Sequence, residues 1–415
     1  MKLKTIAILS IALLVAAACG QPAAAPSPTA APTAAATAKP APVELLVWSH
    51  LQPPEIDAID KVAQQWATAT GNKVKVVLDT GEFDAAVTAI QGGKGPDLMY
   101  GLPHDNLGKF QKAGQLAAVP SGIIDASAYL PTSIAAVSFE GKLLAVPVSM
   151  EAVALFYRTD KVKELPKTFD DLRTQAKGGL GFRYNVKDLF FSFGLIAGYG
   201  GYVFKDKGGG NLDPSDLGLG NDGAKQAYQA LQDMVQKDKL MPADENYDNS
   251  KAAFISGKAA FHINGPWEVD NFKKANIQFA VAKVPPIASG KPWTPFVGVQ
   301  AAFVNAKTSA DKQKAAFDLL KKLQSDLPLN LFKVGNRIPV QKALLENAEV
   351  KSNTNLSAFA ASASDGIPMP NIAAMGAVWG PTGGALDLLA QNKLTPSAAA
   401  DKIVKEVKEG IAQQK

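Results

Sequence analysis

The strongest constraint on the fold is a regular alternation of strand-like and helix-like segments near the start of the folded region. Residues 43–48 (VELLVW) form an apolar run typical of a buried strand, and two prolines at 53–54 then open a helix. An alternating segment at 70–79 (TGNKVKVVLD), a helical stretch at 83–91 and a glycine-rich turn into a short apolar strand at 92–100 (GGKGPDLMY) follow. This order predicts an α/β sheet with parallel strands.

The rest of the chain continues in strands and helices, without an internal repeat. The segment 141–160 (GKLLAVPVSMEAVALFYRTD) holds two strand-like runs with no turn residue between them. We interpret it as one long strand with Glu151 in its middle, which suits a chain that crosses between domains. A length of 415 residues, 47% of them hydrophobic, is enough for two domains. Further strands are predicted at 277–285 and 296–305, and further helices at 104–114, 223–237, 247–257, 267–275, 312–323 and 396–413.

The N-terminus has the pattern of a processing signal. A positive start (MKLK) precedes a short apolar segment that ends in small residues and Cys19, the single cysteine of the chain. We predict a signal peptide at 1–18 and lipidation of Cys19, since the segment is similar to the lipobox of bacterial lipoproteins. Ala16 stands where such motifs usually have leucine, and the alternative is an ordinary secretory signal that happens to contain a cysteine.

Residues 19–42 are predicted to form the lipidated cysteine and a tether. Beyond Cys19 the segment is nearly all Ala, Pro, Thr and Ser, so it cannot bury a core, and its prolines keep it extended. The expected location is therefore the outer face of the cell membrane or the periplasm, with the protein attached by a lipid.

Charge and motif content exclude several classes of function. The formal net charge is +5, with no basic run that could follow a nucleic-acid backbone. The three histidines, His50, His104 and His262, have no metal-ligand spacing, and no phosphate-binding loop or GxSxG nucleophile motif occurs. We therefore expect no nucleic-acid partner, no metal, no cofactor, no catalytic residue and no enzymatic activity.

Several segments, in order, carry a resemblance to a known family. They include NDGAKQAYQAL at 221–231, NGPW at 264–267, PFVGV at 295–299 and GIPMPNIAAMGAVW at 366–379. Together they resemble the maltose/maltodextrin-binding proteins of bacterial ABC importers, over nearly all of residues 43–413. The combination of NGPW with PMPN and a later tryptophan is the most specific part of this similarity.

The resemblance implies an α/β fold of the two-lobed periplasmic-binding-protein type, class II, with the ligand cleft between lobes joined by a three-crossing hinge. Crossings are expected near residues 150–152, 297–299 and about 350. Lobe 1 would comprise 43–150 plus 299–350, and lobe 2 would comprise 151–298 plus 351–415. The family closes its lobes on the ligand by hinge motion and then docks on the membrane subunits of its transporter. A monomer is expected.

The same resemblance implies a set of ligand-binding residues. A pyranose stacks its C–H face on an aromatic ring, and its hydroxyls bond to acids and amides. Trp267 and Trp379 match stacking tryptophans of the family, while Glu151 and Asp105 match acids that bond to hydroxyls. Asp188 and Phe190 take the places of a family acid and an aromatic ring, and Met369 is a lesser lining candidate. His50, Gln52 and Asn106 are further polar candidates, in stretches that depart from the family pattern.

Structural roles remain open for some of these residues. A tryptophan is usually a core residue, Glu151 could be satisfied by a helix N-terminus, and Asp105 could cap the helix that follows it. Among the other tryptophans, we expect Trp48 and Trp66 in the core or at its edge and Trp293, between two prolines, on a surface loop.

Departures from the family pattern leave the identity of the sugar open. Pro53 replaces a lysine, Asn106 replaces an arginine, another arginine is lost near Gly383, and a tryptophan is lost near Gly101. The expected ligands are maltose, maltotriose and maltodextrins. The alternatives are another oligosaccharide or a cyclodextrin in the same fold, a surface glycoside hydrolase that uses Glu151 and Asp188, and a receptor that signals without transport.

Overall fold

The structure of the protein is a computed structural model that describes residues 41–208, 210–287 and 290–414. The predicted signal peptide, Cys19 and nearly all of the predicted tether lie outside these residues. Pro42–Lys415 forms one compact unit. Within the described part of the chain, no helix combines the length and the apolar character needed to span a bilayer.

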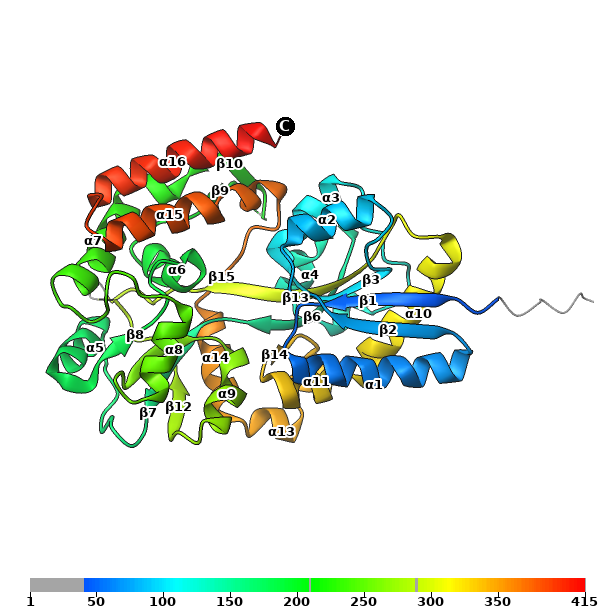
Figure 1. The fold of residues 1–415 in the computed structure, drawn as a ribbon, viewed down its shortest axis with the longest axis horizontal. Helices are drawn as coiled ribbons and strands as arrows, with labels where there is room; N and C mark the ends of the chain where they lie inside the picture. The colour runs from blue at the N-terminus through cyan, green and yellow to red at the C-terminus, as the bar shows by residue number, and fades with distance from the viewer. Residues whose placement is uncertain (1–40, 209, 288–289, 415) are drawn as a thin grey trace, which may run out of the picture. The chain divides into compact units, whose positions relative to one another are not determined.

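The larger of two main sheets holds the strands predicted at the start of the chain (Figure 1). β1 (Glu44–Ser49) pairs in parallel with both β2 (Lys73–Leu78) and β3 (Leu98–Pro103), as the alternation predicted. β13 (Phe296–Val304) runs antiparallel between β3 and β6 (Val146–Glu151), and β14 (Ile338–Pro339) completes that edge. A late strand thus enters between early ones, so this half of the molecule is built from distant parts of the sequence.

Helices cover both faces of this large sheet. α1 (Pro53–Thr70), α10 (Ala310–Asp326) and α11 (Pro328–Gly335) pack on one face, where Ile59, Val62 and Trp66 of α1 are buried at intervals of three and four residues. On the other side lie α2 (Phe83–Gln91), α3 (Leu107–Lys112) and α4 (Pro131–Ala136). In Figure 1, α1 and α11 lie below the strands and α2 and α3 above them.

The smaller main sheet has four strands in the order β12 (Phe279–Ala282), β7 (Ala154–Arg158), β11 (Phe261–Asn264) and β8 (Phe182–Arg183). A hydrophobic core forms around this sheet. The aromatic-rich region 180–204 supplies much of it, including Phe182, Tyr184 and Phe193. The helices of this half are α5 (Phe169–Gln175), α6 (Leu189–Gly198), α7 (Asp222–Gln236), α8 (Tyr247–Ile255), α9 (Val269–Lys274), α14 (Thr354–Ser364), α15 (Trp379–Ala390) and α16 (Pro396–Gln413).

The remaining elements are short. Two-stranded pairs form from β4 (Ser138–Phe139) with β5 (Lys142–Leu143) and from β9 (Phe204–Asp206) with β10 (Leu212–Leu217). β15 (Ile367–Pro368) pairs with the first residues of β13. The other short elements are α12 (Lys342–Leu345), α13 (Ala348–Lys351), a π-helical turn at Ala176–Leu180 and 3-10 turns at His104–Asn106, Ala126–Ala128, Gly218–Gly220, Pro266–Glu268 and Ala373–Ala377.

The chain passes between the two main sheets directly after Glu151. β6 ends at Glu151 in the large sheet, and β7 begins at Ala154 in the small one. The single long strand expected from the sequence is therefore two strands, and the acid ends the first of them instead of lying in the middle. The lobe boundaries at residues 150, 298 and 350 remain a prediction.

Trp293 is a core residue, so its assignment to a surface loop was wrong. Its exposed fraction is 1%, and its ring lies 5.2 Å from that of Phe169. The reason is a glycine on the facing helix: a Cβ at Gly194 of α6 would lie 1.8 Å from the indole Nε1. A missing side chain on one element makes room for the largest side chain of another, and no local pattern around Trp293 indicates this.

We predict that Gly194→Ala lowers the free energy of unfolding by about 1–3 kcal/mol, because the new methyl group overlaps the indole ring of Trp293. Gly384→Ala is the matched control. It lies on the exposed face of α15, where a Cβ meets nothing within 4 Å, so it should stabilise the helix by about 0.5–1 kcal/mol. Urea denaturation of both variants measures the difference, and equal effects would contradict the close packing.

Candidate functional site

A cavity of about 450 Å³ opens between elements of the two halves, within the size range of small-molecule sites. The large-sheet half contributes residues from β3, the turn His104–Asn106, α2, α3 and the end of β6. The small-sheet half contributes residues from α6 and α15. The lining residues are Glu82, Phe83, Asp84, Pro103, Asp105, Asn106, Lys109, Glu151, Phe190, Met369, Gly376 and Trp379. Six of the ten predicted ligand-binding residues are in this set.

One wall of the cavity is aromatic. Trp379 is the first residue of α15, and its ring lies 5.9 Å from that of Phe296, edge to face. The ring of Phe190, in the first turn of α6, lies 6.4 Å from that of Phe296 and 6.1 Å from that of Trp267. The row Trp379, Phe296, Phe190, Trp267 therefore joins the two predicted stacking tryptophans. Phe296, at 1% exposure, backs the row and does not face the cavity.

Trp267 is fixed at the tip of β11 by a local arrangement of backbone and side chains. The strand ends at Asn264, and Trp267 follows in a 3-10 turn that Pro266 begins. Its ring lies directly over Gly265, where a Cβ would be 2.1 Å from the indole. The indole N–H donates to the Tyr247 hydroxyl at 2.9 Å, and that hydroxyl donates to Glu268.

Trp267 does not belong to the described wall of the cavity, although it contacts Phe190, which does. Its half-buried ring and its bond to Tyr247 show that it also has a structural role. Its stacking on a sugar stays a prediction.

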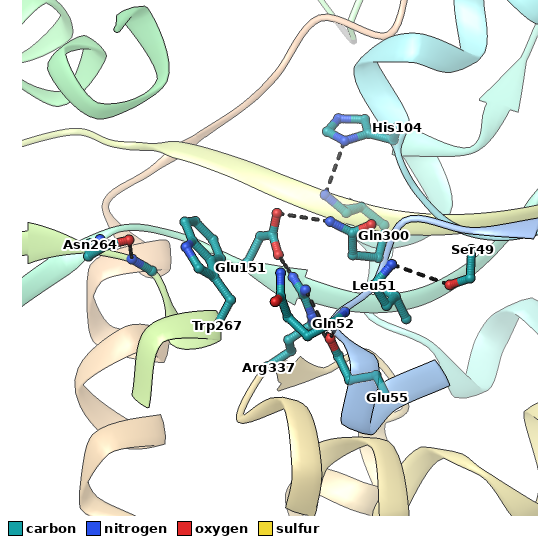
Figure 2. Close-up of polar contacts among 12 residues, drawn as sticks. Ser49, Leu51, Gln52, Glu55, His104, Glu151, Asn264, Trp267, Gln300 and Arg337 are labelled. Atoms are coloured by element: carbon teal, nitrogen blue, oxygen red, sulfur yellow. Dashed lines mark hydrogen bonds and ion pairs between the residues drawn. The ribbon is translucent and has the colours of Figure 1, made fainter. Parts of the chain in front are cut away.

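Glu151 occupies the floor of the cavity and is 6% exposed. One carboxylate oxygen accepts a hydrogen bond from Gln300 Nε2 at 2.9 Å, and the other is ion-paired with Arg337 (Figure 2). The alternative that a helix N-terminus satisfies this acid is wrong, since a side-chain amide and a guanidinium do so.

Asp105 faces the cavity and is not a helix cap. The residue at the N-cap of α3 is Asn106, and the Asp105 carboxylate accepts hydrogen bonds from Trp379 Nε1 at 3.2 Å and from Asn106 Nδ2 at 3.2 Å. Burial raises the pKa of Asp105 to about 7, and the bond from Trp379 opposes this rise only in part. The site thus contains one acid that titrates near neutral pH.

Besides Trp267, three further predicted residues do not line the cavity. Asp188 caps α6, where it accepts from Phe190 N at 2.8 Å, and burial raises its pKa. His50 pairs with Asp79 at 3.0 Å, and burial lowers its pKa. Gln52 is exposed at the N-cap of α1. Met369 does line the cavity, and its carbonyl oxygen bonds to His104.

Sequence reasoning missed a polar group at the rim of the cavity. Glu82, Asp84 and Lys109 line it, and Lys109 Nζ lies 2.8 Å from an Asp84 oxygen. The available signal was the acidic pair that flanks Phe83 between a predicted strand and a predicted helix. Two carboxylates there add hydrogen-bond acceptors opposite the aromatic wall.

The positions where the sequence departs from the family pattern have local roles here. Pro53 is the first residue of α1, a position where a missing backbone N–H costs nothing. Gly383 lies within α15, and Asn106 lines the cavity. Across the described residues, no group of three or more His, Cys, Asp or Glu side chains could hold a metal ion.

The family follows from comparison with known sequences. Residues 61–358 match the family described as bacterial extracellular solute-binding protein. The chain belongs to this family, and its fold is the two-lobed α/β fold of periplasmic binding proteins.

Relatives with named ligands extend this result. The chain is 30% identical over 375 residues to the maltooligosaccharide ABC transporter solute-binding lipoprotein of Streptococcus pneumoniae strain R6, with 86% of each chain covered. It is 28% identical to the maltotriose-binding protein of Pyrococcus abyssi, over 89% of this chain and 82% of that one. It is also 28% identical to the galactooligosaccharide-binding protein of Bacillus subtilis, over 88% and 89%.

Solved structures agree. The maltose-maltodextrin binding protein of Alicyclobacillus acidocaldarius superimposes with a TM-score of 0.84 at 37% identity, over 88% of this chain and all of that one. The Thermus thermophilus maltotriose binding protein, bound with maltotriose, gives a TM-score of 0.82 at 31% identity over the same shares.

We predict that Asp105→Asn makes the protein more stable at pH 8, by up to about 4 kcal/mol, with the gain shrinking toward pH 4. The pKa of Asp105 is about 7 in the folded protein, whereas an unfolded aspartate has a pKa near 3.8. The wild type therefore loses stability as the pH rises through this interval, and the variant does not. Urea denaturation at pH 5, 6, 7 and 8 measures the difference.

The comparison with wild type isolates Asp105, because buried His104 and His262, whose pKa values burial lowers to about 4, contribute the opposite slope in both proteins. Asp57→Asn, on the exposed face of α1, is the control and should follow the wild-type curve. A constant offset of Asp105→Asn at all four pH values would contradict the raised pKa.

Proposed function

We propose that this protein is the lipid-anchored substrate-binding component of an ABC importer. It captures maltose, maltotriose and related maltodextrins and delivers them to the membrane subunits of the transporter. The observation that carries the proposal is the composition of the cavity. An aromatic wall faces a floor and rim of carboxylates, which is the pairing that a pyranose requires.

The parts of the cavity have separate tasks in this proposal. Trp379 and Phe190 stack on the apolar faces of the sugar rings, and Trp267 extends the same wall. Asp105 and Glu151 accept hydrogen bonds from hydroxyls, and Glu82 and Asp84 do so at the rim. Because the lining residues come from both halves, a ligand that bonds to both favours the closed arrangement.

The proposed location rests on the N-terminal sequence and on one relative. Cys19 carries the lipid, residues 20–42 act as the tether, and the folded protein works at the outer face of the membrane as a monomer. A relative that is 30% identical is named a solute-binding lipoprotein. Metabolic labelling with an azido fatty acid, and its loss in Cys19→Ser, tests the anchor separately from sugar binding.

We also propose that the protein has no enzymatic activity. A glycosidase needs two carboxyl groups that flank one glycosidic bond. Of the two acids considered for that role, Glu151 lines the cavity and is ion-paired with Arg337, whereas Asp188 caps α6 and is not part of the described lining.

A second candidate is an oligosaccharide other than a maltodextrin in the same site. One relative at 28% identity is named a galactooligosaccharide-binding protein. The loss of expected polar groups at Pro53 and Gly383 removes contacts that would distinguish one hydroxyl arrangement from another.

Isothermal titration calorimetry with a panel of oligosaccharides separates these candidates. The panel contains maltose, maltotriose, maltotetraose, α-cyclodextrin, a β-galactooligosaccharide and cellotriose. Tight binding of the linear maltodextrins supports the proposal, and preference for the galactooligosaccharide supports the second candidate. No binding of any member at millimolar concentration would refute both.

We predict that Trp379→Ala weakens binding of maltotriose by about 1–3 kcal/mol, that is, roughly fivefold to 150-fold, because the variant loses a stacking face and a hydrogen bond to Asp105. Titration calorimetry measures the loss, and urea denaturation shows that the variant is folded. Trp66→Phe is the control: Trp66 is buried in the large-sheet half and bonds to Asp318, so its variant should lose stability and keep its affinity. Equal affinities of Trp379→Ala and wild type would remove Trp379 from the site.

A further inference from the structure

Three charged side chains are buried together beneath the cavity, and only one of them is a cation. Arg337 directly precedes β14 and is 4% exposed, Glu55 in the first turn of α1 is 0% exposed, and Glu151 is 6% exposed. Figure 2 shows the guanidinium of Arg337 between the two carboxylates. The residues are separated by up to 282 positions in the sequence, and no sequence motif joined them.

Glu55 fixes the orientation of the guanidinium. Arg337 Nε donates to Glu55 Oε1 at 2.8 Å, and Arg337 Nη2 donates to Oε2 at 3.2 Å, so the pair is bidentate. The Gln52 backbone N–H also donates to Glu55, at 2.9 Å. A Cβ at Gly335 would lie 2.2 Å from Glu55, so this glycine lets the carboxylate approach the end of α11, two residues before Arg337.

Glu151 receives the remaining side of the guanidinium. Arg337 Nη1 donates to one oxygen of Glu151, and Gln300 Nε2 donates to the other at 2.9 Å. On the facing strand β13, Gly298 is paired with Glu151, and a Cβ there would be 3.0 Å from its Cγ. A carboxylate can accept about four hydrogen bonds, so Glu151 keeps acceptor capacity on the side that lines the cavity.

We propose that Arg337 is the positioning residue for Glu151 in ligand binding. Held by Glu55, it keeps the buried carboxylate of Glu151 aimed at the cavity, so that a ligand hydroxyl meets an acceptor already in place. The inference rests on the proposed function, because it assigns Glu151 to a sugar hydroxyl. Arg337 itself is not part of the described lining of the cavity and acts through Glu151.

The physical reason is the cost of a buried charge. A carboxylate taken out of water without a partner either binds a proton or turns toward solvent, and in both cases it stops being an oriented acceptor. One guanidinium serves two buried carboxylates here, so its loss leaves both uncompensated. A buried ion pair is weak evidence for a contribution to stability, because the cost of desolvation can exceed the attraction.

A double-mutant cycle tests whether Arg337 acts through Glu151. We expect Arg337→Met to weaken binding of the oligosaccharide that the wild type binds best, with a dissociation constant at least about tenfold higher. In the Glu151→Gln background, where no carboxylate remains to be positioned, the same change should raise the dissociation constant less than about threefold. Arg337→Lys keeps the charge without the fork and should recover part of the affinity.

Separate variants control for effects of these substitutions on folding. Removal of the cation leaves two buried carboxylates, so we expect Arg337→Met to fold in reduced yield. Glu55→Gln/Arg337→Met removes one of those charges and provides a second route to the same measurement. Arg173→Met is the matched control, because Arg173 pairs with the 6% exposed Asp238 in the small-sheet half, away from the cavity. It should lower the unfolding temperature without changing the affinity.

The outcomes separate this inference from the proposed function. Suppose that the wild type binds a sugar and that folded Arg337→Met or Glu55→Gln/Arg337→Met binds it with an affinity within about threefold of the wild-type value. The inference is then wrong and the proposed function stands. Equal losses in the wild-type and Glu151→Gln backgrounds would also overturn it, since Arg337 would then act independently of Glu151. If the wild type binds no member of the panel, both fall together.

Discussion

The buried ion pair between Arg337 and Glu151 is the interaction on which the site depends. Glu151 ends β6, and the next strand of the chain belongs to the other sheet. A charge at such a point would normally be disfavoured in a protein interior. Here one guanidinium, one side-chain amide and a glycine on the facing strand together make the position tolerable. Glu151 therefore belongs both to the place where the chain crosses between the halves and to the polar floor of the cavity.

The cavity combines two kinds of surface that are made in different ways. The aromatic wall is part of the small-sheet core: Phe296 stacks on Phe193 at 3.6 Å within it and backs Phe190 and Trp379 at its edge. The polar side is supplied by the residues that follow strands of the large sheet and by the first turn of α2. Packing fixes the first surface, and hydrogen bonds and ion pairs fix the second, so the same cavity is apolar on one side and acidic on the other.

Local patterns in the sequence predicted the elements whose signals are local. The parallel strands at the start of the chain, the buried face of α1 and the full span of α16 follow from periodicity, prolines and turn residues. Trp293 and Arg337 were beyond such reasoning, because each depends on a glycine or carboxylate more than 90 positions away. Asp105 shows the intermediate case: the motif placed it near the site, but only the bond from Trp379 distinguishes a cavity residue from a helix cap.

The bond between Trp379 and Asp105 has a consequence for the spacing of the site. It joins α15, which packs in the small-sheet half, to the turn after β3 in the large-sheet half, so a side-chain hydrogen bond links the two halves beside the cavity. Trp379 and Asn106 both donate to Oδ2 of Asp105, so a hydroxyl that bonds to Oδ1 leaves the indole in place. An aromatic face and a carboxylate are thereby held at a fixed separation, and a ligand that uses both must match it.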